Sequence, residues 1–140
     1  MELIEMDPRE LVPYPDNPRV NDRTVELLAK SIQDYGFRQP IVADEELVVL
    51  AGHARLKAAL RLGLERVPVV IASGLTEEQA RAYRLADNKT ADLTEWDRSV
   101  LEAEGKLIGD ALQDYGMEFA EQKQGGKAAA HICPRCKHEF

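Results

Sequence analysis

The chain has 140 residues, enough for one domain of ordinary size, and it carries 25 acidic against 18 basic residues, a formal charge of −7. This acidity argues against tight, non-specific binding of duplex DNA, because such binding depends on neutralising phosphates. No apolar run approaches the roughly 18 residues that cross a bilayer, and the N-terminus lacks the basic start of a secretion signal. We therefore expect a cytoplasmic protein with no membrane partner.

The first part of the chain predicts a strand, an irregular segment and a helix. Residues 2–6 favour a short strand, and three prolines within residues 11–19 exclude a helix there. A helix is predicted over about residues 23–35, because its apolar residues share one face and Gly36 follows it. That apolar stripe consists of Val25, Leu28, Ile32 and Tyr35.

The spacing of the apolar residues then changes from the pattern of a helix to that of a strand. Residues 39–43 and 47–50 predict two strands around an acidic turn, for which a hairpin is the simplest arrangement. A helix follows over about residues 54–62, and residues 67–71 return as a strand. Pro68 favours either an edge position for this strand or a place at its start.

The remaining pattern is helical. Thr76 and Gln79 have the spacing of a capping box, which opens a helix that is expected to end at about residue 86 or 87. A last helix is predicted to start near Thr94 or Trp96, and the single tryptophan is expected in the core. These elements predict an α/β (α+β) fold in which helices pack on a small mixed sheet.

The candidate functional feature lies where a strand passes through Gly52 into the helix that carries His53, Arg55 and Lys57. Glycine lets the backbone approach a ligand closely, and the first N–H groups of a helix lack partners and carry partial positive charge. A phosphate could bind at this turn, with Arg55 beside it. The turn could equally be structural, and His53 could either contact a phosphate or cap the turn.

Four segments in this order resemble the N-terminal domain of ParB-type proteins, in the ParB/sulfiredoxin superfamily. They are Leu11–Arg19, Glu26–Ile41, Ala51–Ala59 with Val67–Val70, and Ala86–Thr90. In detail they look most like the ParB-like domain of phages and mobile elements, which often precedes a DNA methyltransferase. The resemblance covers about residues 3–104 and implies a ParB/sulfiredoxin-like fold with a nucleotide triphosphate site.

The resemblance assigns the phosphate site residue by residue. Gly52, His53, Ala54 and Arg55 fall on a Gly-Glu-Arg-Arg motif, so the glycine and the last arginine match while the glutamate and the first arginine are replaced. The loop residues Arg38 and Gln39 would approach the nucleotide, or would only set the entry angle of the next strand.

A second motif of the family, Glu-Asn-x-x-Arg, falls on Asp87, Asn88 and Ala91, so its arginine is absent here. The resemblance implies that Asn88, and Asp87 beside it, hold Mg²⁺ next to a CTP or ATP phosphate, since oxygen ligands suit that ion. Lys89, in the same motif, joins the predicted nucleotide-binding residues. The structural alternative is that Asp87 and Asn88 form the C-terminal cap of their helix.

These replacements predict nucleotide binding with weak hydrolysis or none. Sulfiredoxin activity is not expected, because its reactive cysteine would fall near His53 and both cysteines lie in the C-terminal tail. Methyltransferase activity is not expected either, because no Asn/Asp-Pro-Pro-aromatic motif occurs.

We predict a domain serving the modification, partition or regulation of phage or mobile-element DNA. The alternatives are a non-catalytic module that recruits a DNA methyltransferase or other DNA enzyme, and a nuclease.

The tail suggests a metal site. Cys133 and Cys136 have the spacing that lets two thiolates bind one Zn²⁺. The other two ligands would be His131 and His138, or they would come from a second chain in a homodimer; the alternative is a tail without a metal. The predicted organisation is thus a ParB-like domain over 1–116, a flexible linker over 117–130 and a zinc knuckle over 131–140.

Overall fold

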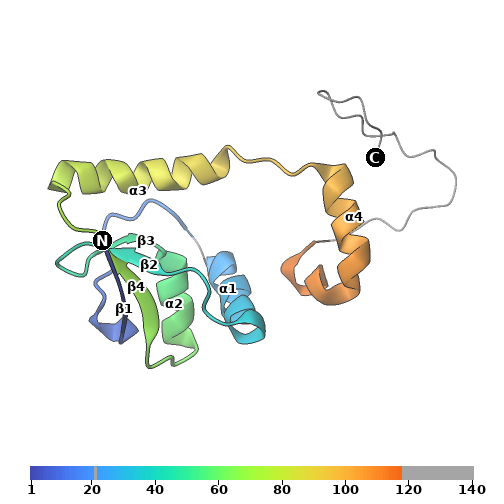
Figure 1. Cartoon of the computed structure of the whole chain (residues 1–140), viewed down its shortest axis with the longest axis horizontal. Coiled ribbons are helices and arrows are strands. Elements are labelled where there is room, and N and C mark those ends of the chain that lie inside the picture. The colour runs from blue at the N-terminus through green and yellow to red at the C-terminus, as the bar shows by residue number, and fades with distance from the viewer. Residues whose placement is uncertain (21, 118–140) are drawn as a thin grey trace, which may run out of the picture. The chain divides into compact units, whose positions relative to one another are not determined.

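The computed structural model describes residues 1–20 and 22–117. Its elements in chain order are β1 (Glu2–Met6), the short 3₁₀ helix η1 (Pro8–Glu10), α1 (Asp22–Tyr35), β2 (Ile41–Ala43), β3 (Val49–Ala51), α2 (His53–Arg61), β4 (Val67–Ile71), α3 (Glu77–Asp92), α4 (Arg98–Ile108) and η2 (Gly109–Tyr115) (Figure 1). The chain divides into two compact units, Met1–Glu95 and a unit that begins at Trp96. This division falls inside the predicted range 1–116.

The four strands form one mixed sheet in the order β1-β4-β2-β3. β1 pairs with β4 and β2 pairs with β3 in antiparallel fashion, while β2 and β4 run parallel. The predicted strands, the β2–β3 hairpin and the mixed sheet are therefore confirmed. Together with the packed helices, the sheet makes an α+β fold.

Pro68 lies in an interior strand, so the expectation of an edge strand is wrong. It is the second residue of β4 and pairs with Glu5 of β1, whereas the parallel pairing with β2 begins only at Val69. The alternative position, at the start of the strand, is confirmed. A residue without an N–H is tolerated there because β2 does not yet run beside it.

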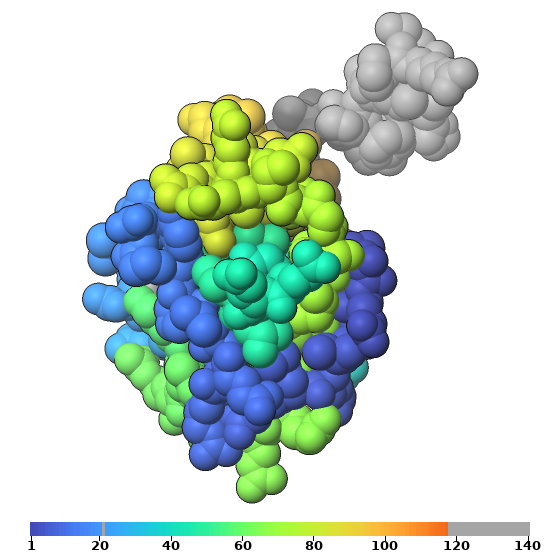
Figure 2. Space-filling view, turned by 90° about the vertical axis from the view of Figure 1, so that its left-hand side faces the viewer, coloured from blue at the N-terminus to red at the C-terminus, as the bar shows by residue number. Residues whose placement is uncertain are grey.

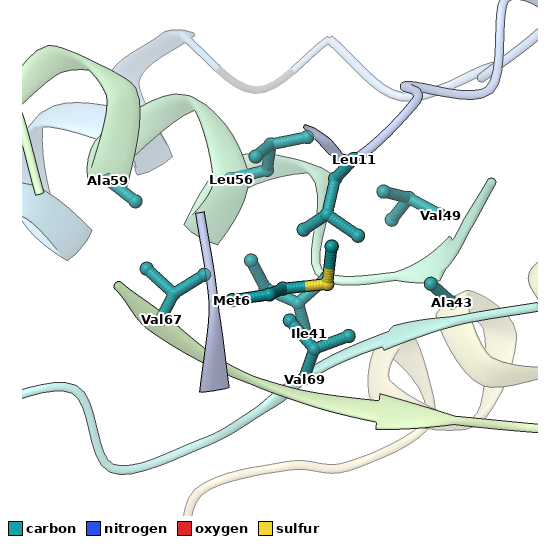
Figure 3. Close-up of a cluster of buried hydrophobic side chains, with 9 residues drawn as sticks. All are labelled: Met6, Leu11, Ile41, Ala43, Val49, Leu56, Ala59, Val67 and Val69. Carbon is teal, nitrogen blue, oxygen red and sulfur yellow. The ribbon is translucent and has the colours of Figure 1, made fainter. Parts of the chain in front are cut away.

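The core lies between the sheet and α2 (Figure 3). It consists of Met6, Leu11, Ile41, Ala43, Val49, Leu56, Ala59, Val67 and Val69. A second cluster joins α1 to α2 through Val25, Ala29 and Ala58. The predicted stripe of α1 is thus largely confirmed, but Tyr35 is 50% exposed because it stands at the last position of the helix. Since α2 is packed on both sides, its N-terminus is firmly held.

α3 begins with the predicted capping box, in which the Thr76 hydroxyl accepts from Gln79 N–H and the Gln79 side chain accepts from Thr76 N–H. It continues to Asp92, so the expected end at residue 86 or 87 is wrong, and so is the interpretation of Asp87 and Asn88 as a C-terminal cap. Only Ala80 and Arg84 of this helix are buried. In Figure 2 the yellow-green start of α3 lies over the turn between β2 and β3.

The second unit contains α4, which confirms the predicted last helix. Its N-cap is Asp97, whose carboxylate accepts from Ser99 N–H and Val100 N–H. Trp96 is 70% exposed, so its expected place in a core is wrong. None of the helices in the described ranges combines the length and apolar character that crossing a membrane requires. The predicted zinc ligands and all of the predicted linker but its first residue lie outside the described residues.

Candidate functional site

A pocket of about 350 Å³ lies where the end of the proline-rich segment (residues 11–19), the first half of α1, the start of α2 and the second half of α3 meet. Its lining includes seven of the predicted site residues, namely Gln39 from the loop before β2, Gly52, His53, Ala54, Arg55, Asp87 and Asn88. Residues from five separate parts of the chain thus converge on one hollow, with Thr24 and Leu28 of α1 among them. The lining also holds Arg19 and Ala91, which face the same space.

The floor of the pocket is the turn from β3 into α2. Gly52 is the N-cap of α2 and has a φ of 100°, in the left-handed region, and no side chain caps this helix. A Cβ at Gly52 would lie 3.0 Å from Arg55 Nη1 and 3.4 Å from the Cα of Ile41. A residue without a side chain therefore lets the turn close against β2, and the first N–H groups of α2 remain available to an anion.

Arg55 is a half-buried cation at this turn. Its Nη1 donates to the carbonyl oxygen of Pro40 over 2.9 Å, which fixes the guanidinium beside the floor of the pocket. Burial lowers the pKa of Arg55, and the charge of nearby Asp87 opposes that shift. Guanidinium groups nevertheless keep their charge in proteins. Among the described residues no carboxylate forms an ion pair with Arg55, so its charge is available to a bound anion.

His53 connects α2 to the proline-rich segment. Its Nε2 accepts a hydrogen bond from the backbone N–H of Tyr14 over 3.2 Å. Burial lowers the pKa of His53 below its ordinary 6.5, and the charges of Arg84 and Lys57 lower it further. The imidazole is therefore neutral near pH 7, with Nε2 as acceptor and the proton on Nδ1. The His53 side chain therefore binds the backbone N–H of Tyr14 and does not cap the first turn of α2.

Asn88 lies on the α3 side of the pocket with both ends of its amide engaged. Its Nδ2 donates to the carbonyl oxygen of Arg84 over 2.9 Å, and its Oδ1 accepts from Arg19 Nη1 over 3.0 Å. Arg19 Nη2 lies 3.4 Å from Asp92 Oδ1. In this arrangement Asn88 does not fit Mg²⁺, because a guanidinium cation takes the oxygen that the ion would need.

Two predicted nucleotide-binding residues are not in the pocket lining. Arg38 turns back to α1, where its Nε donates to the carbonyl oxygen of Tyr35 over 2.7 Å. Lys89 is exposed on α3. Their neighbours Gln39 and Asn88 do line the pocket, so each predicted segment is near the site even where a single residue is not.

Sequence reasoning missed Arg84, the buried charge of α3. Its guanidinium is centred 3.8 Å from the middle of the Tyr14 ring, and its Nε donates to the carbonyl oxygen of Val49 over 3.1 Å. The side chain is only 7% exposed. The available signal was the spacing of Ala80, Arg84 and Asn88, which places all three on one face of a helix.

Comparison with known proteins agrees with the fold. Residues 1–89 match the family model of the ParB N-terminal domain. The ParB-like nuclease domain-containing protein YnaK of Escherichia coli is 38% identical over 80 residues, which are 56% of this chain and 92% of that protein. A nucleoid occlusion protein of Bacillus cereus is 32% identical over 131 residues, 89% of this chain but only 43% of that protein.

Two solved structures share the fold. ParB from Caulobacter crescentus in complex with CTP-γ-S has a TM-score of 0.67 at 22% identity, over 84% of this chain and 67% of that chain. Sulfiredoxin from Arabidopsis thaliana has a TM-score of 0.50 at 26% identity, over 59% of this chain and 97% of that chain. The match to the family model covers more than half of the residues, and YnaK is spanned almost completely. The chain belongs to the ParB N-terminal domain family.

Proposed function

We propose that this domain binds a nucleoside triphosphate, CTP or ATP, in the pocket at the start of α2 and serves DNA partition, modification or regulation. The observation that carries the proposal is the uncapped N-terminus of α2 at Gly52, beside the unpaired charge of Arg55. Backbone N–H groups and a guanidinium are the donors that phosphate oxygens prefer. The CTP-γ-S bound to the Caulobacter ParB supports CTP as the first ligand to test.

The proposed activity is binding with slow hydrolysis or none. His53 stands where the family motif has a glutamate, and its Nε2 is engaged by the Tyr14 N–H. Asn88 Oδ1 is engaged by Arg19. Neither group is free to act on a water molecule or to hold a metal ion in this arrangement, so the described residues favour a binding site over an efficient active site.

Calorimetry with CTP, ATP and GTP tests this proposal. Arg55→Ala is expected to weaken binding of the preferred nucleotide by about 1.5 to 3 kcal/mol, because it removes charge-assisted hydrogen bonds. Arg61→Ala is the matched control, since Arg61 is an exposed arginine on the same helix whose Nη1 lies 4.0 Å from Glu26 Oε1. It should bind as the wild type does. Absence of binding of any of the three nucleotides at millimolar concentration would contradict the proposal.

A second candidate is a non-catalytic module that recruits a DNA enzyme such as a methyltransferase. The observation that favours it is α3, which leaves Leu85 and, two turns later, Leu93 exposed on the same side of a helix with few buried residues. Exposed apolar side chains that gather on one element often mark a protein-binding surface. A wild type that binds no nucleotide, but loses association with the DNA enzyme on Leu85→Ser, would support this candidate instead.

A further inference from the structure

We infer that Arg19 supplies the positive charge beside Asn88 that a divalent cation would otherwise provide, so that this domain binds its nucleotide without requiring Mg²⁺. The inference rests on the proposed function and concerns the same pocket. It assigns a binding role to a residue of the proline-rich segment, which lies far from both family motifs along the chain.

The guanidinium of Arg19 lies where a metal ion would have to bind. Its Nη1 is 3.0 Å from Asn88 Oδ1 and its Nη2 is 3.4 Å from Asp92 Oδ1, so it faces two oxygens on successive turns of α3. Arg19 also lines the pocket that holds Gly52 and Arg55. A positive charge is therefore already present on the α3 side of the pocket.

The orientation of the Asn88 amide is set by its second hydrogen bond. Nδ2 donates to the carbonyl oxygen of Arg84, so Oδ1 has to point away from that carbonyl and toward Arg19. A metal ion could reach this oxygen only after Arg19 had moved. Because two cations repel each other at such short range, Arg19 and Mg²⁺ exclude each other at Asn88.

The pocket has room for Arg19 because Ala91, one helical turn from Asn88, contributes only a methyl group to the lining. The Arg19 side chain is 48% exposed, and its partners are a neutral amide and a carboxylate that is itself 55% exposed. Exposed pairs of this kind are weak. The guanidinium can thus release Asp92 at little cost and turn Nη2 to a phosphate, while Nη1 stays on Asn88 Oδ1, because it has five N–H donors.

With Arg55 at the floor and Arg19 on the α3 side, the pocket presents two guanidinium groups from different segments. A triphosphate between them would meet a cation on each side. The usual need for a metal ion, to neutralise the phosphate charge, is then met by side chains.

Calorimetry on the full chain, with CTP in excess Mg²⁺ and again in excess EDTA, tests the inference. The dissociation constant of the wild type is expected to change by less than about threefold between the two conditions. Arg19→Ala is expected to bind at least about tenfold more weakly in EDTA, because the charge-assisted bonds are lost. Added Mg²⁺ is expected to restore part of this loss, because Asn88 Oδ1 becomes accessible.

Arg81→Ala is the matched control, since Arg81 is an exposed arginine of α3 that forms a 2.8 Å ion pair with Glu77 and does not line this pocket. It should bind as the wild type does under both conditions. A wild type that binds only with Mg²⁺, or an Arg19→Ala variant that binds in EDTA as well as the wild type, would overturn the inference. If Arg55→Ala still loses affinity in that case, the proposed function stands; if the wild type binds no nucleotide, both proposals fall.

Discussion

Gly52 and Gly63 both have positive φ angles, 100° and 67°, but their surroundings differ. A Cβ at Gly63 would meet no atom within 4 Å, whereas a Cβ at Gly52 would press on Arg55 Nη1 at 3.0 Å. Gly63→Ala should therefore cost only the backbone strain, about 1 kcal/mol of unfolding free energy. Gly52→Ala should cost more than that and should also weaken nucleotide binding, because Arg55 must leave Pro40.

Urea unfolding and calorimetry on both variants check this prediction. Gly63→Ala is the control for backbone strain and should leave nucleotide affinity unchanged. Equal losses of stability in the two variants, with unchanged affinity in both, would show that the close approach at Gly52 has no role in binding.

His53 makes stability depend on pH. Its pKa in the folded state lies below the ordinary 6.5, so the folded state resists protonation while the unfolded state does not. The contribution of neutral His53 to the free energy of unfolding should be complete above pH 6.5. This contribution should be lost as the pH drops from there toward the lower folded-state pKa. Protonation also ends the acceptor role of Nε2 toward Tyr14 N–H.

His53→Gln retains an acceptor but does not titrate, so its stability should fall less over this range. Urea unfolding of both proteins from about pH 7.5 to about pH 5 measures the difference. Parallel pH profiles for the two proteins would mean that His53 already binds a proton as readily in the folded state as in the unfolded one.

At the scale of elements, α3 is a helix of 16 residues whose described attachment to the sheet runs through few side chains. Arg84 is the main one, because it stacks on Tyr14 and its Nε donates to the carbonyl oxygen of Val49, the first residue of β3. Arg84→Leu should lower the free energy of unfolding by about 1 to 3 kcal/mol, since a buried carbonyl loses its donor and the cation–π contact disappears.

Arg81→Leu, one turn earlier on α3, removes an exposed ion pair with Glu77 and should change stability by no more than about 0.5 kcal/mol. Chemical denaturation of the two variants separates a buried from an exposed arginine on the same helix. If Arg84→Leu were as stable as Arg81→Leu, the stack on Tyr14 would contribute nothing to holding α3.

The same helix shows where sequence reasoning was limited. Its start was predictable, because a capping box is a local pattern read from Thr76 and Gln79. Its end was not, because the polar pair Asp87-Asn88 resembles a helix terminus, whereas here Asn88 binds Arg84 one turn back and Arg19 from another segment. Contacts between segments far apart in the sequence decide where such a helix ends, and a local sequence pattern carries no information about these contacts.

At the scale of the whole molecule, the strands, the hairpin and the first two helices followed from hydrophobic period and from glycine and proline positions. The convergence of Gly52–Arg55 and Asn88 on one pocket came from the family resemblance, and the pocket lining contains these residues. The roles of Arg19 and Arg84 could not be predicted from the sequence. Each arginine looks like an exposed charge there, because its partner lies far along the chain and comes close only in the fold.

The order of strands also bears on how the chain is assembled. β4 lies between β1 and β2, and Glu2 of β1 pairs with Ile71 of β4. During synthesis β1 therefore leaves the ribosome well before β4, the strand it pairs with, exists, and the hairpin of β2 and β3 can form first. Until β4 arrives, β1 is an unpaired strand with free N–H and C=O groups. Its exposed glutamates, at positions 2 and 5, give this early strand a negative charge that discourages pairing with other nascent chains.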